Sequence, residues 1–91
     1  MNERTNLYIR AIQKWGASAQ YIMVIEECAE FIHQITRILR GSADSGKVAE
    51  ELADIEIMIE QFRILQPDVA VQADIIKHEK LDRLRERLDE S

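Results

Sequence analysis

Two pairs of carboxylates share one spacing, in two segments that are otherwise rich in apolar residues. In the segment IEECAEF, Glu30 follows Glu27 by three positions, and in EELAD Asp54 follows Glu51 by the same spacing. Successive residues of a helix are rotated by about 100°, so residues three apart lie on neighbouring parts of one face. All four side chains offer hard oxygen ligands, which favours Mg²⁺, Mn²⁺ or Ca²⁺ over zinc.

Helical projection places these acids in or beside the apolar stripe of each segment. Glu27 lies at the edge of the first stripe with Glu30 beside it, and Glu51 lies inside the second stripe with Asp54 beside it. Glu26 points outward and is expected to be solvated. Burying unpaired carboxylates is costly, and no Lys or Arg is predicted on these stripes to neutralise them. A divalent cation is therefore expected, together with phosphoryl or pyrophosphate chemistry.

Other readings of these residues remain open. Acids that flank a helical stripe are often solvated boundary positions of a bundle, although the repetition in phase favours a metal site. The element Glu30-x-x-His33 matches one half of a ferritin-like di-iron site, but Asp54 is followed three residues later by Ile57, so His33 is interpreted as a surface residue. Cys28 is interpreted as a small hydrophobic residue.

The apolar residues recur at intervals of three and four, which predicts an all-α domain of four helices over residues 1–91. The expected helices cover about residues 3–14, 18–40 and 68–89, with a third that begins near Ser45 or Lys47 and ends near Leu65. Gly16, Gly41 and Pro67 mark the breaks between them, and Ser18 and Asp68 are predicted N-caps. A chain of 91 residues buries a limited core, which favours oligomers.

Composition excludes several classes of function. The net charge of −5 argues against a nucleic-acid-binding surface, because phosphate neutralisation needs a basic patch. No apolar run approaches the ~18 residues of a membrane span. The segment MNERTNLYIR lacks the apolar stretch of a signal peptide, and a single cysteine allows no internal disulfide. We therefore expect a cytoplasmic protein without membrane or nucleic-acid partners.

The acid motifs and their context resemble a known family. Glu-Glu-x-x-Glu at residues 26–30, followed by Glu-x-x-Asp at 51–54, is similar to the signature of the MazG-like all-α nucleoside triphosphate pyrophosphohydrolases. The segment KWG at residues 14–16, Gln20 and the helix ELADIEIMIEQ support the resemblance. It extends from about Leu7 to Leu88.

The resemblance implies a four-helix-bundle-like MazG fold and a specific activity. Members of this family hydrolyse the α–β phosphoanhydride of nucleoside triphosphates, which yields the monophosphate and pyrophosphate, as in cleaning of the nucleotide pool. They require Mg²⁺, for which Mn²⁺ is an alternative, and assemble as homodimers or homotetramers with the site near subunit contacts. By this resemblance the metal ligands are Glu27, Glu30, Glu51 and Asp54, and Glu27 or Glu30 serves as the catalytic base that activates a metal-bound water.

The resemblance also implies cationic substrate ligands on the fourth helix. The segment HEKLDRL resembles the family segment Asn-x-Lys-aromatic-x-Arg and places Lys80 and Arg83 in its basic positions. It departs from that segment because His78 replaces the Asn and Leu81 replaces the aromatic residue. Lys77 lies on the leucine stripe of the same helix and is a further candidate, since a triphosphate needs cations opposite the metal.

Trp15 is a candidate for stacking on a nucleotide base, with packing in a core or an interface as the alternative. Two other functions remain open for the whole chain. One is a non-catalytic helical-bundle module whose oligomer is its function. The other is a relative of the dUTPases or of the phosphoribosyl-ATP pyrophosphohydrolases, which share the bundle but act on different substrates.

Overall fold

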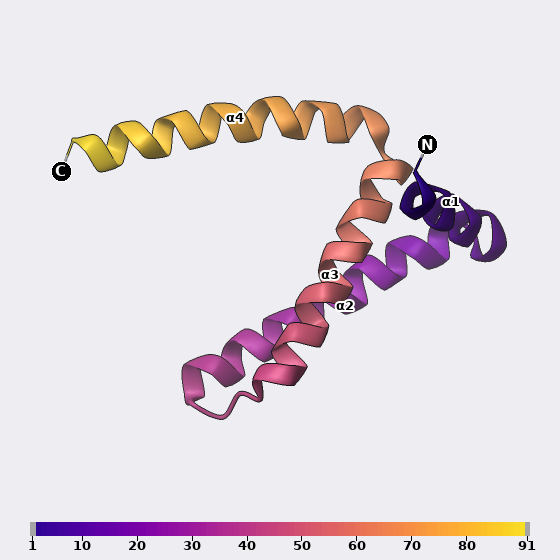
Figure 1. Cartoon of the computed structure of the whole chain (residues 1–91), viewed down its shortest axis with the longest axis horizontal. Helices are drawn as coiled ribbons and strands as arrows, with labels where there is room; N and C mark the ends of the chain where they lie inside the picture. Colours follow the sequence, from indigo (N-terminus) through magenta and orange to yellow (C-terminus); the bar gives the residue numbers. More distant parts are fainter. Residues whose placement is uncertain (1, 91) are drawn as a thin grey trace.

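The computed structural model describes residues 2–90, which form helices only (Figure 1). The all-α prediction is therefore confirmed for this part of the chain. No helix within it combines the length and the apolar character that crossing a membrane requires. In chain order the elements are α1 (Glu3–Trp15), α2 (Ala17–Arg40), α3 (Ser45–Leu65) and α4 (Pro67–Asp89).

Local interactions explain where most of the helices begin and end. The side chain of Asn2 caps α1 by accepting a hydrogen bond from the N–H of Thr5 at 2.8 Å. At the end of α2, Gly41 adopts the left-handed conformation (φ 75°), and its N–H donates to carbonyls of the last turn. Asp44 caps α3 by accepting from the N–H of Gly46 at 2.9 Å.

Two predicted N-caps are wrong. Helix α2 already begins at Ala17, because Gly16 (φ 88°) turns the chain directly out of α1 and serves as the N-cap without a side-chain bond, so Ser18 lies inside the helix. Helix α4 begins at Pro67, whose fixed φ suits the first helical position. Asp68 therefore lies in the first turn of α4, where its negative charge interacts favourably with the helix dipole.

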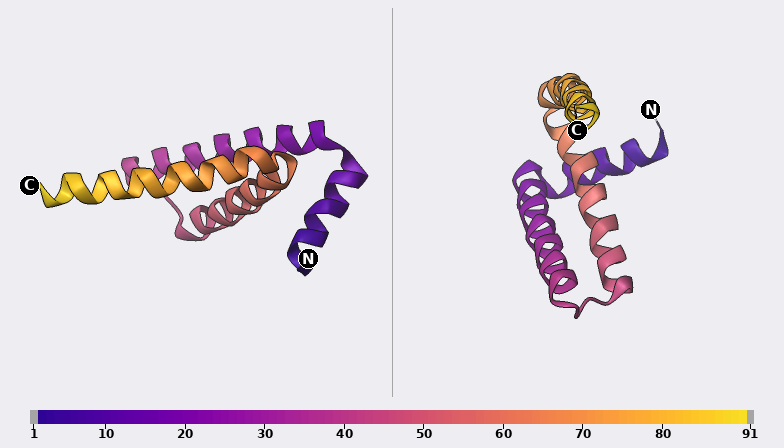
Figure 2. Two further views of the ribbon diagram at one scale, coloured as in Figure 1. Left: turned by 90° about the horizontal axis from the view of Figure 1, so that it is seen from above. Right: turned by 90° about the vertical axis from the view of Figure 1, so that its left-hand side faces the viewer.

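Helices α2 and α3 form an antiparallel hairpin, which is the main packed unit of the chain (Figures 1 and 2). Their contact follows residues spaced alternately by three and four, as in an antiparallel coiled coil. All of these residues except Ile38 are buried or half-buried. They are Gln20, Val24, Glu27, Phe31, Gln34 and Ile38 of α2, and Val48, Glu51, Ile55, Met58, Phe62 and Leu65 of α3.

This seam contains many polar residues for the contact between two helices. Glutamines or glutamates occupy four of its positions: Gln20, Glu27, Gln34 and Glu51. Within residues 2–90, the only buried apolar side chains are those of Tyr8 and Met58. The hairpin alone therefore buries little apolar surface.

Helix α1 crosses the outer side of the hairpin and contacts both of its helices. The hydroxyl of Tyr8 donates to Glu60 Oε1 at 3.1 Å, and Arg4 Nη1 forms an ion pair with Glu60 Oε2 at 3.1 Å. Burial raises the pKa of the Tyr8 hydroxyl, and the hydrogen bond to Glu60 raises it further. These contacts hold α1 near the end of α3.

Helix α4 extends away from the hairpin as an arm (Figures 1 and 2). Within the described residues it packs only against α3, close to the turn at Pro67. Arg63 Nη2 donates to both carboxylate oxygens of Asp74 at 2.7 Å, and Gln66 Nε2 donates to the hydroxyl of Tyr21. The Cα radius of gyration is 16.4 Å, whereas a compact domain of this length has about 12 Å. The four helices therefore do not close into a bundle within one chain.

Candidate metal centre and adjoining pocket

Three of the four predicted metal ligands lie together where α2 meets α3. Each of Glu27, Glu51 and Asp54 contributes a carboxylate oxygen, and these oxygens lie within 4.8 Å of one another. Glu27 and Glu51 are half-buried, and Asp54 is exposed. The antiparallel packing brings Glu51 opposite Glu27, and helical rotation places Asp54 beside it on the same side of α3.

The inner carboxylates are not satisfied by protein donors. Within residues 2–90, Glu27 Oε2 and Glu51 Oε2 are buried and have no hydrogen-bond partner. The pKa of Glu27 is raised above its ordinary value, first because burial disfavours its charged form and then because Asp54 and Glu51 repel that charge. A buried acceptor without a donor destabilises the folded chain unless another group satisfies it.

Glu30 lies at the border of this cluster. It is exposed and does not belong to the group of oxygens within 4.8 Å. Its charge still contributes to the raised pKa of Glu27. It therefore lies near the cluster but outside the set of converging oxygens.

This set of donors fits a hard divalent cation. Oxygen ligands on opposite sides of Mg²⁺ are about 4 Å apart at its preferred bond length. Small side-chain rotations would bring Glu27, Glu51 and Asp54 into that range. A cation there would satisfy both orphaned oxygens and remove the repulsion between the carboxylates. The absence of Cys and His from the group disfavours zinc.

The acids belong to two longer stripes with alternating spacings of four and three. Because the helices are antiparallel, the two stripes present the same order of residue types from the α1 end to the loop between α2 and α3. On both helices a methionine precedes two acids, and a cationic residue lies nearest the loop; α3 also carries Gln61 before its methionine. We call this side of the hairpin the acid face: Met23, Glu27, Glu30, Gln34 and Arg37 of α2, and Gln61, Met58, Asp54, Glu51 and Lys47 of α3.

The expectation that no cation shares the acid stripes is wrong. Helix α3 begins at Ser45, so Lys47 already lies in its first turn. It precedes Glu51 by four residues and Asp54 by seven, which places all three on one face. Lys47 is exposed and makes no ion pair with any residue between 2 and 90, so it leaves the acids unneutralised.

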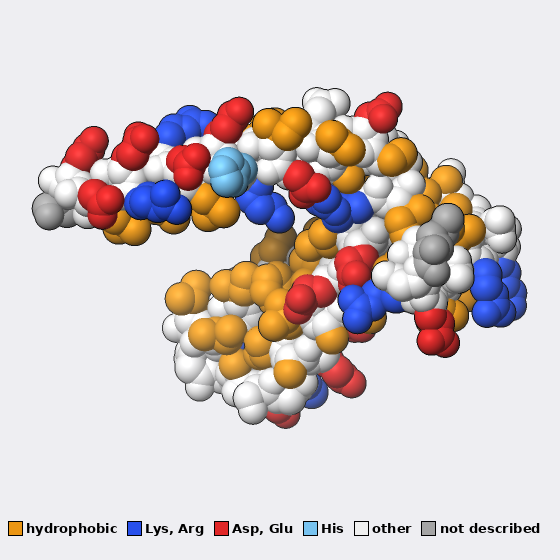
Figure 3. Space-filling model, turned by 45° about the horizontal axis from the view of Figure 1, so that its top comes forward, with side chains coloured by type: hydrophobic (Ala, Val, Ile, Leu, Met, Phe, Trp, Pro, Cys, Tyr) orange, Lys and Arg blue, Asp and Glu red, His pale blue; other side chains and the backbone are white. Residues whose placement is uncertain are grey.

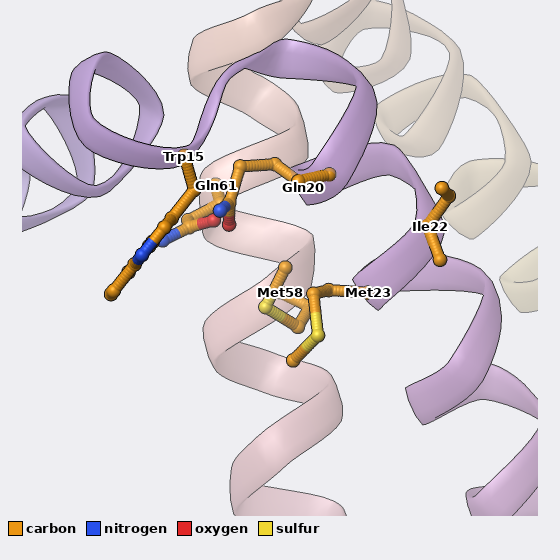
Figure 4. Close-up of a pocket in the computed structure, with 7 residues that line it drawn as sticks. Trp15, Gln20, Ile22, Met23, Met58 and Gln61 are labelled. Carbon is orange, nitrogen blue, oxygen red and sulfur yellow. The ribbon is translucent and has the colours of Figure 1, made fainter.

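An apolar pocket of about 590 Å³ lies next to the acids, toward α1. It is lined mainly by Trp15, Met23, Met58 and the two glutamines Gln20 and Gln61. Figure 4 shows the two methionines converging between α2 and α3, with Trp15 and the glutamines at the α1 end. Met23 precedes Glu27 by one helical turn, and Met58 follows Asp54 by one turn, so the pocket adjoins the carboxylates.

The polar groups of this pocket are buried. Gln20 and Gln61 have 4% and 6% of their surface exposed, and Gln61 Oε1 is buried without a hydrogen-bond partner in the described chain. Trp15 is 61% exposed, and the Lys14 ammonium lies 5.6 Å from the centre of its ring. Trp15 is therefore not a core residue of the single chain.

Within one chain, the predicted cationic substrate ligands on α4 do not lie near the carboxylate cluster. Lys77, Lys80 and Arg83 are exposed on the arm, which has no contact with α2. The arm also leaves the hairpin on the side opposite the acid face, since Tyr21, the partner of Gln66, projects to that side of α2.

Sequence reasoning missed Lys47, Gln61 and the pocket. The signal for Lys47 was its spacing of four residues before Glu51, which places both residues on one face of the helix. The pocket has no comparable signal, because it joins the end of α1 to the far end of α3. Comparison with known proteins gave no match: no family model, no curated protein and no solved structure matches this chain.

Proposed function

We propose that this chain is a Mg²⁺-dependent nucleoside triphosphate pyrophosphohydrolase that forms the monophosphate and pyrophosphate. The observation that carries the proposal is the cluster of Glu27, Glu51 and Asp54, with two buried oxygens that find no donor among residues 2–90. The resemblance of both acid motifs to the MazG-like family supplies the substrate class and the bond cleaved.

In this proposal Glu27, Glu51 and Asp54 hold the metal, and Glu30 completes the ligand set from the solvent side. Bound Mg²⁺ supplies charge neutralisation at the phosphates and lowers the pKa of a coordinated water. Glu30 is the better placed base, because it is exposed beside the cluster and is not enclosed in the seam. The adjoining pocket with Trp15 offers an apolar surface for the base of the nucleotide.

The proposal includes a second copy of the chain. A row of apolar residues on α2 lies on the side opposite the acid face, and we call it the apolar face: Ile25, Cys28, Ile32, Ile35 and Leu39. Three of them, Ile25, Ile32 and Leu39, are 67%, 61% and 82% exposed. Figure 3 shows hydrophobic side chains gathered on the body below α4, across an open gap from that helix.

A homodimer or homotetramer would cover this face. The occupant we propose is a second copy, because the described part of a single chain buries only two apolar side chains, Tyr8 and Met58, and a core this small favours association. Leucines of α4 are also exposed, with Leu81, Leu84 and Leu88 between 48% and 66%, so the arm offers a second surface for the same contact.

The activity is tested by measuring pyrophosphate release from each (deoxy)nucleoside triphosphate in the presence of Mg²⁺. Glu27→Gln and Asp54→Asn should each reduce kcat/KM by at least about 100-fold, because each removes a charged metal ligand. The matched control is Glu56→Gln, an exposed carboxylate on the far side of α3. Full activity in both site variants would contradict the assignment of the metal ligands. If the wild-type protein released no pyrophosphate, the proposed function would be refuted.

A non-catalytic helical module is the second candidate, and the exposed apolar face is the observation that favours it. This candidate predicts the same oligomer but no change in thermal stability with Mg²⁺ and nucleotide. The enzyme predicts stabilisation when both are present, because they bind the folded state only.

A further inference from the structure

We infer that the acid face binds its nucleotide in one direction, with the ring in the pocket between Trp15 and Gln61 and the terminal phosphate at Lys47. The inference rests on the proposed function for the class of ligand. It adds the orientation of that ligand and two residues, Gln61 and Lys47, that the acid motifs do not contain.

The order of side chains along α3 carries the first step. From the N-terminal end, the acid-face positions of this helix are a cation, two carboxylates, a methionine and an amide: Lys47, Glu51, Asp54, Met58 and Gln61. On helix α2, Arg37 lies at the end near Lys47 and Met23 at the end near Met58, with Glu30 and Glu27 between them. The side chains of the acid face therefore change from cationic near the loop, through acidic, to apolar at the pocket.

The pocket end suits a planar heterocycle. The exposed ring of Trp15 provides a stacking surface, and the two methionines provide polarisable apolar walls. Gln61 is 6% exposed and its Oε1 has no partner within residues 2–90, so it is a buried acceptor beside the pocket (Figure 4). A ring N–H or amino group would satisfy that acceptor, whereas an aliphatic ligand would leave it unpaired.

The loop end suits a terminal phosphate. Lys47 lies one helical turn, about 6 Å, beyond Glu51 in the direction away from the pocket. It forms no ion pair with the described residues. Arg37 lies on the same face of α2, where its Nε donates to His33 Nε2 at 3.1 Å. Met58 and Lys47 are separated by about 16 Å along α3, a span that an extended nucleoside triphosphate can bridge with its inner phosphates over the carboxylates.

The test uses Trp15 fluorescence, since this is the only tryptophan of the chain. The full-length protein is titrated with three probes in the presence of Mg²⁺. These are a nucleoside triphosphate analogue with a methylene group between the α- and β-phosphorus atoms, the corresponding nucleoside monophosphate, and inorganic tripolyphosphate. Tripolyphosphate, which lacks a ring, is followed by its competition with the analogue.

Lys47→Met should weaken the binding of the analogue and of tripolyphosphate by about tenfold. It should leave the affinity for the monophosphate unchanged, because only the outer phosphates reach the cation. Gln61→Leu should weaken the binding of the analogue and of the monophosphate by about tenfold and leave the affinity for tripolyphosphate unchanged. The control is Arg40→Met, which removes an exposed cation at the same end of α2 but on the opposite side from Glu27. A second substitution, Gln61→Met, guards against a folding defect specific to leucine.

Loss of monophosphate binding in Lys47→Met, or of tripolyphosphate binding in Gln61→Leu, would overturn the orientation. Equal effects of Lys47→Met and Arg40→Met would show a general charge effect and would also overturn it. These failures are distinct from failure of the proposed function, because the latter shows as absence of hydrolysis by the wild-type protein.

Discussion

The carboxylates of Glu27 and Glu51 face each other across the seam of the α2/α3 hairpin, with ligand oxygens no more than 4.8 Å apart. One oxygen of each is buried and has no hydrogen-bond partner in the described part of the chain. Two like charges in a half-buried contact oppose folding, so the pair destabilises the folded protein unless a cation neutralises it. This relationship leads to the first two predictions.

Mg²⁺ is expected to stabilise the wild-type protein. At a free concentration 100 times the dissociation constant, a ligand that binds only the folded state adds about 2.7 kcal/mol to the free energy of unfolding. Thermal unfolding with EDTA and with Mg²⁺ measures this as a rise in Tm. Glu27→Gln and Asp54→Asn should lose most of the rise, whereas Glu56→Gln should retain it. An equal rise in all four proteins would indicate a general salt effect and contradict the site.

Without metal, Glu27→Gln is expected to be more stable than the wild-type protein at neutral pH. The pKa of Glu27 is raised, so between its ordinary value and that raised value the folded chain binds more protons than the unfolded chain. The free energy of unfolding therefore falls as the pH rises through this window. Glu27→Gln removes this contribution and should raise Tm by a few degrees.

The same prediction has a pH-dependent control. As the pH is lowered in EDTA toward the raised pKa of Glu27, this carboxylate becomes increasingly protonated in the folded wild-type protein, and the difference in Tm between the two proteins should shrink. A difference that stays constant or grows over this range would contradict the raised pKa. Glu56→Gln reports the effect of removing a carboxylate outside the cluster.

The apolar face of α2 should be required for assembly. Ile32 is 61% exposed in the single chain, so Ile32→Lys would cost little in a monomer. In an interface it places a charge against apolar surface, and we expect a shift from dimer or tetramer to monomer together with a lower Tm. Light scattering after size-exclusion chromatography measures the mass. Glu26→Lys places a lysine on an exposed part of the same helix about 120° away from Ile32 and should leave the mass unchanged.

Gly41 should be needed for its backbone conformation rather than for space. Its φ is 75°, and a Cβ at this position would meet no atom within 4 Å. Gly41→Ala should therefore lower the free energy of unfolding by about 1 kcal/mol, which is the cost of a left-handed alanine. Gly41→Asn should lower it less, because asparagine tolerates this conformation better. Chemical denaturation measures both, and equal losses would contradict the backbone explanation.

The sequence was sufficient for the helices and for the grouping of three acids. Their periodicity is a local property, so the phase of Glu27, Glu51 and Asp54 relative to the apolar stripes could be obtained by projection alone. Local reasoning failed at Ser18 and Asp68, where an adjacent glycine or proline started the helix earlier than the polar residue. It also failed at Lys47, which lies in the first turn of α3, four residues before Glu51, and so belongs to the acid face.

By itself, then, the sequence determined which residues are helical, where Gly41 and Pro67 interrupt them, and which side of each helix carries its acids. Only the tertiary structure decided that Glu27 lies opposite Glu51, that Trp15 and Gln61 line one pocket, and that α4 leaves the hairpin as an arm. The physical reason is that helical rotation is set by neighbouring residues, whereas the register and direction of packing depend on contacts between residues far apart in the chain.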